Sequence, residues 1–299
     1  MMSASDGPFD LHEIAQLRPT KAGAPLFLAA KDGERLAYYP FLVATDKERA
    51  VAILYHGGGA YSMSLYQWMA EQLQQHGVST YCADLRGHGY SGGQRGDAPT
   101  IDTVYDDVSA MISLVRSKHP GLPVHLIGHS SGGGLLCNYH HNRRDSRVAG
   151  YIMLAPFLGP KSGTIRYEGT DPRSFVKHAR GWLFVLNALL PVSWFHHVDA
   201  VYFNYSESLK LDNPLLLSVY TYTMSSATTP YDIHAILSSW GNTPLHIFVG
   251  SNDEQFLPDR YKILLQATRG NTSDVTVVAG AKHLSILKQS PDLIIQCIK

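Results

Sequence analysis

Short apolar runs alternate along the chain with longer stretches in which apolar residues recur at helical spacing. Runs of the kind that forms buried strands occupy residues 50–55, 78–83, 124–127, 148–154, 245–250 and 275–278. Helical periodicity covers residues 66–76, 103–119, 257–268 and 293–298. This alternation predicts an α/β fold with a mostly parallel central sheet and helices on both of its faces.

The chain before the first of these runs predicts a β-hairpin. Residues 26–30 and 36–42 are strand-like, and Lys31-Asp32-Gly33 lies between them. Asp-Gly is a favoured pair for a tight turn between two strands. We therefore expect two antiparallel strands at the start of the sheet.

Residues 157–240 interrupt the alternation. The stretch is rich in aromatic and apolar clusters, is punctuated by prolines, and has helix-like pieces at residues 175–190 and 206–222. A connection of this length between two strands is too long for a simple loop. We therefore predict an inserted, mainly helical cap over a core domain formed by residues 1–156 and 241–299.

Composition excludes some partners. The 25 lysines and arginines balance 25 aspartates and glutamates among 299 residues, so the sequence carries no electrostatic footprint for nucleic acid. Only 17% of the residues are charged and 17 are tyrosines. This composition indicates more apolar surface than average, which suits a small lipid-like ligand.

Cysteine usage and the apolar runs indicate a cytoplasmic protein. Cys82, Cys137 and Cys297 are widely spaced, which is typical of buried reduced thiols and not of a disulfide framework or a metal site. Residues 1–10 lack the layout of a signal peptide, and residues 182–190, the longest apolar candidate, are too few to cross a membrane. We expect no transmembrane segment and no cofactor.

The strongest chemical signal is Gly128-His129-Ser130-Ser131-Gly132, which follows the apolar run at residues 124–127. This G-x-S-x-G pattern predicts a nucleophile elbow, a strained strand-to-helix turn that lifts the Ser130 hydroxyl clear of the sheet. The backbone N–H of Ser131 would then point to where an oxyanion forms. By itself, the pattern also fits an inactive turn rich in glycine and serine.

A serine nucleophile needs a base, and the base needs an acid that orients it. In a parallel sheet the active groups lie beyond the carboxyl ends of the strands. Asp253 and Glu254 follow the run at residues 245–250, and His283 follows the run at residues 275–278. We expect Asp253 to be the acid, with Glu254 as its rival, and His283 to be the base.

A further segment makes a family resemblance explicit. Residues 84–96 read D-L-R-G-H-G-Y-S-G-G-Q-R-G. Together with the elbow and the order Ser, Asp, His, this segment resembles the α/β-hydrolase fold serine hydrolases of the monoacylglycerol lipase, lysophospholipase and serine aminopeptidase-like group. The resemblance spans residues 31–154 and 245–283, whereas the insert agrees in position only. It implies an α/β-hydrolase fold and His283 as the histidine of the family's G-x-x-H position.

The resemblance also implies an oxyanion hole. His56-Gly57-Gly58-Gly59 is similar to the family's H-G-x-G loop, which would make Gly58 the second donor beside Ser131. The triple glycine is also similar to the HGGG loop of hormone-sensitive-lipase-like esterases, where Gly58 or Gly59 would serve. Those esterases usually carry an acidic residue before the serine, where this chain has His129, so we favour Gly58.

Other histidines and aromatics have plainer interpretations. We expect His56, His88 and His129 to pack or to hydrogen-bond around the site. We expect the pairs His140-His141 and His196-His197 to be surface or structural residues rather than metal ligands. Candidate substrate-binding residues are Gly59, His129, Trp182, Phe184 and Trp194. The three aromatic candidates would line an acyl pocket, touch a membrane transiently or form the cap's own core.

The activity that the resemblance implies is hydrolysis of a carboxylic ester through an acyl-enzyme. A monoacylglycerol or lysophospholipid-like ester is the substrate class that it suggests. Thioesters, small aryl esters and peptides stay open as alternatives. A non-catalytic ligand-binding protein of the same fold is the alternative from another functional class.

Overall fold

The computed structural model describes residues 8–9, 17–20, 23–62, 64–167, 171–190 and 193–298. Its centre is an eight-stranded sheet with the order β1-β2-β4-β3-β5-β6-β10-β11. The strands are β1 Leu26–Ala29, β2 Arg35–Phe41, β3 Ala50–Tyr55, β4 Val78–Ala83, β5 Val124–His129, β6 Gly150–Leu154, β10 Leu245–Gly250 and β11 Val275–Val278. Strand β2 pairs antiparallel with both β1 and β4, and the other neighbours pair parallel.

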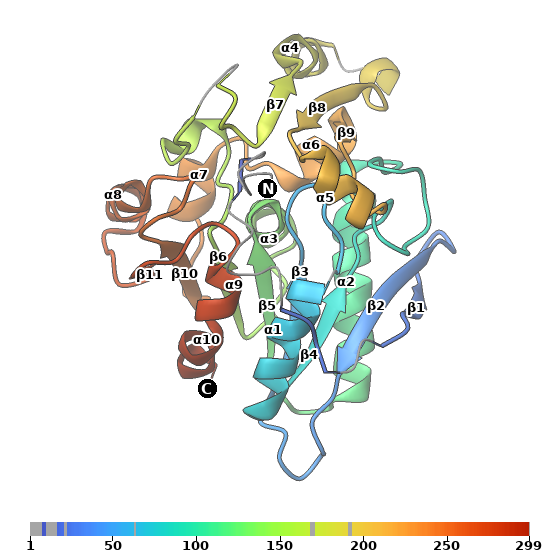
Figure 1. Ribbon diagram of the computed structural model, residues 1–299, viewed down its shortest axis with the longest axis vertical. Helices are drawn as coiled ribbons and strands as arrows, with labels where there is room; N and C mark the ends of the chain where they lie inside the picture. The colour runs from blue at the N-terminus through green and yellow to red at the C-terminus, as the bar shows by residue number, and fades with distance from the viewer. Residues whose placement is uncertain are drawn as a thin grey trace.

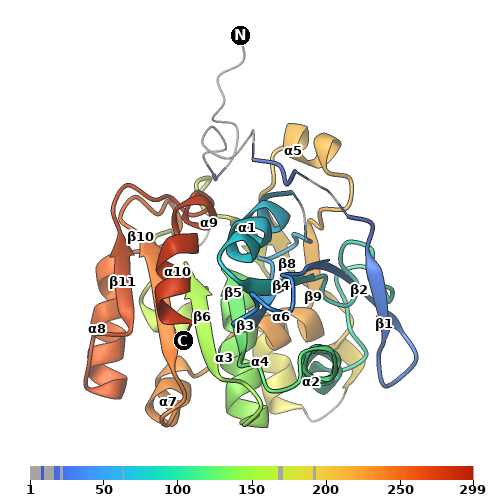
Figure 2. The ribbon, with the colours of Figure 1, turned by 90° about the horizontal axis from the view of Figure 1, so that it is seen from below.

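Helices cover both faces of this sheet (Figure 2). One face carries α1 Ser64–Gln75, α9 Ile286–Gln289 and α10 Pro291–Cys297. The other carries α2 Ile101–Lys118, α3 Ser131–Arg143 and α8 Pro258–Arg269. The predicted α/β fold with its mostly parallel sheet is therefore confirmed, and so is the antiparallel hairpin at its start.

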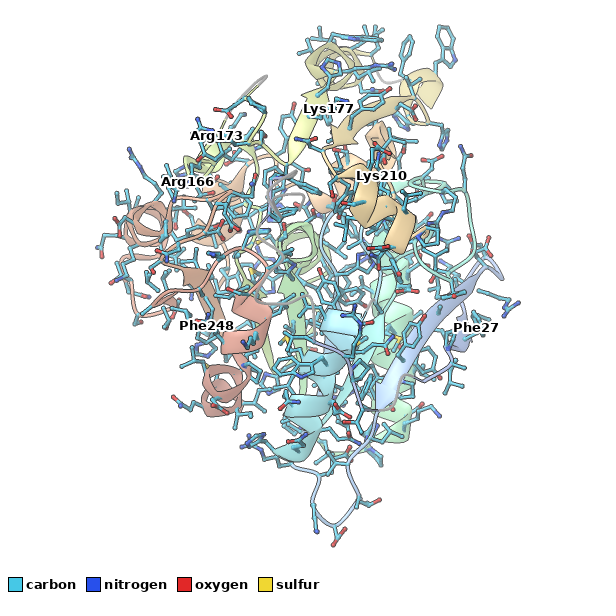
Figure 3. All side chains as sticks on the ribbon, in the orientation of Figure 1. Phe27, Arg166, Arg173, Lys177, Lys210 and Phe248 are labelled. Atoms are coloured by element: carbon cyan, nitrogen blue, oxygen red, sulfur yellow. The ribbon has the colours of Figure 1, made fainter. Side chains whose placement is uncertain are left out.

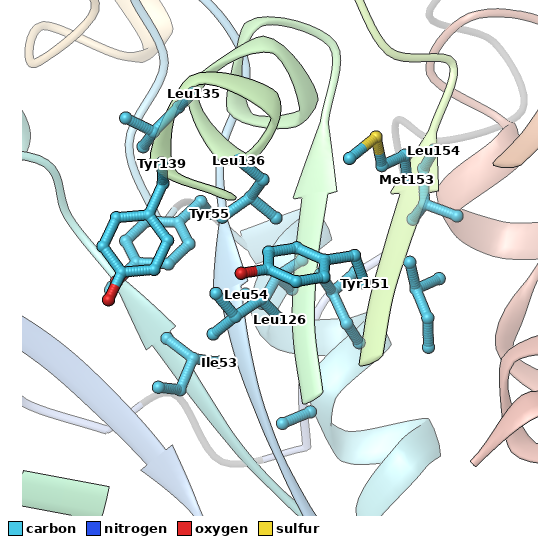
Figure 4. Close-up of a cluster of buried hydrophobic side chains, with 14 of the residues drawn as sticks. Ile53, Leu54, Tyr55, Leu126, Leu135, Leu136, Tyr139, Tyr151, Met153 and Leu154 are labelled. Carbon is cyan, nitrogen blue, oxygen red and sulfur yellow. The ribbon is translucent and has the colours of Figure 1, made fainter. Parts of the chain in front are cut away.

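The central strands are mostly apolar because both of their faces are covered. Strands β3, β4, β5 and β6 are buried at every position. Figure 4 shows side chains of β3, β5 and β6 packed together with Leu135, Leu136 and Tyr139 of helix α3. This packing fixes the position and direction of α3 relative to the sheet, and α3 begins directly after Ser130.

The stretch between β6 and β10 is less helical than the sequence predicts. Its elements are a 3₁₀ turn η1 Pro160–Ser162, β7 Val176–Ala179, α4 Gly181–Leu189, a second 3₁₀ turn η2 Ser193–Phe195, β8 Asp199–Phe203, α5 Glu207–Asp212, β9 Val219–Thr221, α6 Tyr222–Thr228 and α7 Ile233–Ser238. The order β7-β8-β9 forms a small antiparallel sheet at one end of the molecule (Figure 1).

The expectation of helices over residues 175–190 and 206–222 is therefore only partly correct. Residues 176–179 and 219–221 are strands, and the helical residues within those ranges belong to α4, α5 and the first position of α6. Strands of three to five residues give too few positions for period two to be recognised, and Val, Tyr and Phe favour strands once they are half-buried. Pairing between strands in the folded chain, and not the local sequence pattern, therefore determines that these residues are strands.

Two later helices of the stretch join the layers around the large sheet. Helix α6 packs against α2 and α3, and α7 packs against α3 and α8. The extent of the cap, expected over residues 157–240, stays a prediction, and these contacts favour placing its end near β9. Within the described ranges, no helix has both the length and the apolar character needed to span a bilayer.

Candidate active site

Ser130 lies at the turn between β5 and α3 in a strained conformation. Its backbone has φ 53° and ψ −118°, a left-handed value that residues with a Cβ rarely adopt. Close packing requires glycine on both sides. A Cβ on Gly128 would lie 2.6 Å from the backbone of Gly132, and a Cβ on Gly132 would lie 2.6 Å from the carbonyl oxygen of Tyr55. The elbow geometry expected from the pattern is thus present.

The Ser130 hydroxyl, the His283 ring and the Asp253 carboxylate form one hydrogen-bonded chain. His283 Nε2 lies 3.1 Å from Ser130 Oγ, and His283 Nδ1 lies 3.0 Å from Asp253 Oδ2. Because a carboxylate only accepts, Nδ1 carries the proton and Nε2 is free to accept from the hydroxyl. All three side chains are nearly buried, with exposed fractions of 6%, 2% and 1% in the order named.

The two acidic neighbours have different tasks. Asp253 Oδ1 accepts from the backbone N–H groups of Gln255 and Phe256 at 2.8 and 2.9 Å, so the carboxylate is fixed while Oδ2 faces the imidazole. Glu254 Oε2 instead accepts from the backbone N–H of His283 at 2.7 Å. The geometry therefore places Asp253, and not its rival, against the histidine ring.

His129 links two parts of the site. Its Nε2 lies 3.0 Å from the carbonyl oxygen of His283, and its Nδ1 lies 2.9 Å from the hydroxyl of Tyr66. A carbonyl only accepts, so Nε2 donates and Nδ1 accepts from the tyrosine. Burial, with the nearby His283 as a smaller cause, lowers the pKa of His129 to about 3. The ring is neutral and both its nitrogens are used.

The three glycines after His56 are not equivalent. The N–H of Gly57 donates to the Tyr66 hydroxyl at 2.9 Å, and the N–H of Gly59 donates to the Tyr220 hydroxyl at 2.8 Å. Among the described residues, the N–H of Gly58 has no acceptor within hydrogen-bond reach. A Cβ on Gly58 would lie 2.7 Å from Ser131 Oγ, so this glycine sits beside the first residue of α3.

A cavity of about 310 Å³ opens over Ser130. One wall is formed by the start of α1 and by the segment that contains residues 57–59, which we call the glycine loop. The residues of this wall are Gly57, Gly58, Ala60, Ser64, Leu65 and Tyr66. The stretch between β6 and β10 forms the opposite wall with Phe175, Tyr205, Leu209, Asp212, Asn213 and Leu216. An apolar wall with a few polar groups near a reactive hydroxyl is typical of a small-molecule site.

The aromatic candidates of the insert lie elsewhere. Trp182 and Trp194 are 56% and 80% exposed, and Phe184 packs against the rings of Tyr222 and Tyr231. None of these three candidates lines the cavity. The prediction that these three aromatics line an acyl pocket is therefore wrong, and other residues of the insert line the cavity. The reason is that β7 and β8 direct α4 and η2 away from Ser130.

Several lining residues were not foreseen from the sequence. Phe9 stacks on the His283 ring with centroids 5.3 Å apart, and Gln255 Nε2 holds the carbonyl of Pro8 at 2.8 Å. Phe175 packs against Phe9 at 4.9 Å and against Tyr205 at 5.0 Å. No motif marks these residues, because they reach the site only through tertiary packing.

The described ranges contain no group of three or more His, Cys, Asp or Glu side chains arranged to hold a metal ion. Of the histidine pairs, His140 Nε2 lies 2.9 Å from the carbonyl of Trp240, and His197 Nδ1 lies 2.8 Å from Asp97 Oδ2. Each of these rings therefore has a structural partner within the protein.

Comparison with known proteins matches residues 46–288 to the family described as serine aminopeptidase, S33. A monoacylglycerol lipase of Mycolicibacterium smegmatis is 32% identical over 144 residues, which is 48% of this chain and 48% of that protein. A phospholipase of Bacillus subtilis is 32% identical over 114 residues, covering 38% of this chain and 43% of that protein. The matched part of the chain thus spans less than half the length of these relatives.

Solved structures agree with the fold over nearly the whole chain. A soluble variant of the monoglyceride lipase of Saccharomyces cerevisiae, in complex with a substrate analogue, superposes with a TM-score of 0.66. That superposition covers 94% of this chain and 98% of the yeast chain at 18% identity. At this identity the likeness concerns the fold alone.

Proposed function

Because this chain belongs to the serine aminopeptidase S33 family of hydrolases, we propose that it hydrolyses carboxylic esters with Ser130 as nucleophile. The observation that carries the proposal is the hydrogen-bonded chain from Ser130 through His283 to Asp253 at the floor of the cavity. A serine hydroxyl becomes nucleophilic when an oriented base takes its proton. His283 has the tautomer that this task requires.

In the proposed reaction, Ser130 Oγ attacks the ester carbonyl carbon while its proton passes to His283 Nε2. The new Oγ–C bond converts the carbonyl oxygen into an oxyanion. When the tetrahedral intermediate collapses, the C–O bond to the alcohol breaks and the alcohol leaves with the proton from Nε2. A water molecule then gives a proton to Nε2 and attacks the acyl-enzyme, which releases the carboxylic acid and restores Ser130.

We assign the oxyanion hole to the backbone N–H groups of Gly58 and Ser131. Ser131 is the first residue of α3, where a backbone N–H has no partner within the helix. Gly58 lies beside it, and its N–H has no acceptor among the described residues. Gly59, the alternative donor, already gives its N–H to Tyr220. The hydrogen bonds of the loop therefore support Gly58.

The substrate we propose is an ester of an apolar acyl group, in the manner of a monoacylglycerol or lysophospholipid. Phe175, Tyr205 and Leu216 give the cavity an apolar wall, and Asp212 and Asn213 supply polar groups near it. The relatives named as a monoacylglycerol lipase and a phospholipase favour the same class. A cytoplasmic location and independence of any cofactor stay predictions.

We also propose transient contact with a lipid surface through α4 and η2. Trp182, Leu189 and Trp194 are 56%, 73% and 80% exposed, respectively. Trp182 and Leu189 are seven positions apart on α4 and so lie on one face of the helix. Lys177 of β7 lies at the same end of the molecule (Figure 3). Exposed tryptophan beside a cation is typical of an interfacial segment.

The proposed activity is tested with p-nitrophenyl esters of graded acyl length and a monoacylglycerol, using the wild-type chain and Ser130→Ala. We expect turnover by the wild type that rises with acyl length over the range the cavity holds. Loss of the nucleophile should lower kcat by about 10⁶-fold, the size measured when a serine nucleophile of this kind is removed. Covalent labelling of Ser130 by a fluorophosphonate probe should disappear in the same variant.

The outcomes separate the alternatives. Turnover of thioesters or aminoacyl amides in preference to oxygen esters would reassign the leaving group while keeping Ser130. If the well-folded wild type neither turns over any ester nor reacts with the probe, the ligand-binding alternative replaces the enzyme.

A further inference from the structure

The stretch between β6 and β10 makes direct hydrogen bonds to the glycine loop. The Tyr205 hydroxyl donates to the carbonyl oxygen of Gly58 at 2.6 Å, and the Tyr220 hydroxyl accepts from the N–H of Gly59 at 2.8 Å. The N–H of Leu217 also donates to the carbonyl oxygen of Gly59 at 2.8 Å. Both peptide groups that follow the N–H of Gly58 are therefore held from outside the core sheet.

The direction of each bond around Tyr220 follows from its neighbours. His88 Nδ1 lies 2.8 Å from the carbonyl oxygen of Arg86, so Nδ1 must donate. His88 Nε2 then accepts from the Tyr220 hydroxyl at 2.7 Å. The tyrosine oxygen is left to accept from Gly59. Burial lowers the pKa of His88 well below its ordinary value, which keeps the ring neutral. Because the neutral ring has one donor and one acceptor nitrogen, each hydrogen bond around Tyr220 has one direction only.

The glycine loop also packs closely against the insert, the stretch between β6 and β10. A Cβ on Gly58 would lie 3.3 Å from the Phe203 ring, and a Cβ on Gly59 would lie 2.3 Å from the carbonyl oxygen of Leu217. Gly59 also has a φ of +66°, which favours glycine. The glycine loop is therefore closely packed against β8, β9 and the residues between these two strands.

We propose that Tyr205 and Tyr220 are positioning residues that select Gly58 as the oxyanion donor and hold its N–H in place. The inference rests on the proposed function, because it concerns the donor of that reaction. With Tyr66 occupying the N–H of Gly57 and Tyr220 occupying the N–H of Gly59, only the middle glycine of the three is left for substrate. The insert thus completes the active site as well as covering it.

The proposal has a consequence for catalysis. Donors stabilise an oxyanion strongly only when they are already aligned, since realignment during the reaction costs free energy. Loss of one such donor lowers kcat by about 10²–10³-fold. Removal of a tyrosine hydroxyl leaves the donor present but less well held, so we expect a fall of about tenfold or more within that limit.

The test compares Tyr220→Phe, Tyr205→Phe and the matched control Tyr202→Phe. Tyr202 lies on β8 of the same small sheet, and its ring contacts His178 instead of the glycine loop. The readouts are kcat and KM for a p-nitrophenyl ester and the inhibition constant of an alkyl trifluoromethyl ketone. That ketone adds to a serine hydroxyl and places its oxygen in the oxyanion hole, so it reports on the donors directly.

We expect Tyr220→Phe and Tyr205→Phe to lower kcat by about tenfold or more and to weaken the ketone by a similar factor, with KM nearly unchanged. The control should keep the wild-type values. The proposal is overturned if kcat stays at the wild-type level, if KM alone changes, if ketone affinity is retained while kcat falls, or if the control loses as much. Should Tyr220→Phe fail to fold, Tyr205→Phe decides, because its hydroxyl lies in a half-buried side chain at the cavity wall.

These outcomes differ from failure of the proposed function itself. If the wild type has no esterase activity and Ser130→Ala changes nothing, the proposed reaction is wrong, and the positioning role of the tyrosines in that reaction is rejected with it. If the wild type is active, loses activity in Ser130→Ala and is indifferent to all three tyrosine substitutions, the reaction stands and only the positioning role is rejected.

Discussion

His283 is separated from Ser130 by 153 positions and from Asp253 by 30, yet its ring contacts both side chains. Each residue follows the carboxyl end of a parallel strand, so the sheet brings the three together on rigid supports. The backbone of His283 is fixed on both sides, because Glu254 accepts from its N–H and His129 donates to its carbonyl.

At this scale the two acidic residues can be told apart. Asp253→Asn should lower kcat by about 10⁴-fold without unfolding the protein, because an amide next to Nδ1 favours the wrong imidazole tautomer. Glu254→Gln should have a much smaller effect, since its amide oxygen can still accept from the His283 N–H. Steady-state kinetics and thermal unfolding of both variants check this. The reverse ranking would transfer the acid role to Glu254.

Among the elements, α4 differs most from what a helix on a protein surface usually presents. Trp182, Val185 and Leu189 are all more than half exposed and lie on one face of the helix. Each apolar side chain that enters a lipid surface contributes about 1.5–3 kcal/mol when it is fully buried. The contact proposed for this face therefore requires only partial burial of these side chains in the lipid surface.

Replacement of this face should separate membrane binding from catalysis. The double variant Trp182→Ser, Leu189→Ser should lower binding to phosphatidylcholine–phosphatidylglycerol vesicles by about tenfold or more, since two apolar contacts are lost. Hydrolysis of a water-soluble short ester should not change. Leu211→Ser is the matched control, because Leu211 is 82% exposed but lies on α5. Equal vesicle binding by the wild type and the double variant would reject the contact.

At the scale of the whole molecule, burial keeps five histidines of the described ranges neutral. Burial is the first cause that lowers the pKa of each of them: His56, His88, His125, His129 and His140. For His125 and His129 the lowered values are about 4 and about 3. In the unfolded chain a histidine has a pKa of about 6.5. The unfolded state therefore binds more protons than the folded state in mildly acidic solution.

Stability should consequently decrease as the pH falls below about 6.5. The contribution of each buried neutral histidine is complete above that pH and is lost progressively toward its folded pKa. At pH 5, His125 and His129 should each have cost the folded state about 2 kcal/mol relative to neutral pH. Urea unfolding at pH 7, 6 and 5 measures this change, and His125→Asn should reduce the slope. A free energy of unfolding that is constant over this range would contradict the prediction.

The sequence by itself was sufficient for the large sheet and for the candidate nucleophile. The central strands are mostly apolar because both their faces are covered, so their pattern and length were enough to locate them. Gly128 and Gly132 mark the elbow because a Cβ at either position meets backbone atoms. The prediction of Asp253 and His283 used their positions after two further strands, the order Ser, Asp, His, and the resemblance of His283 to the histidine of the family's G-x-x-H position.

Only the tertiary structure decided how the insert meets the glycine loop. The three short strands β7, β8 and β9 have no usable periodicity of their own, and they exist because they pair with one another. Their pairing turns Trp182 and Trp194 outward and brings Tyr205 and Tyr220 onto the loop. The choice between Gly58 and Gly59 depends on which N–H a distant hydroxyl occupies, and no local pattern of residues records that contact.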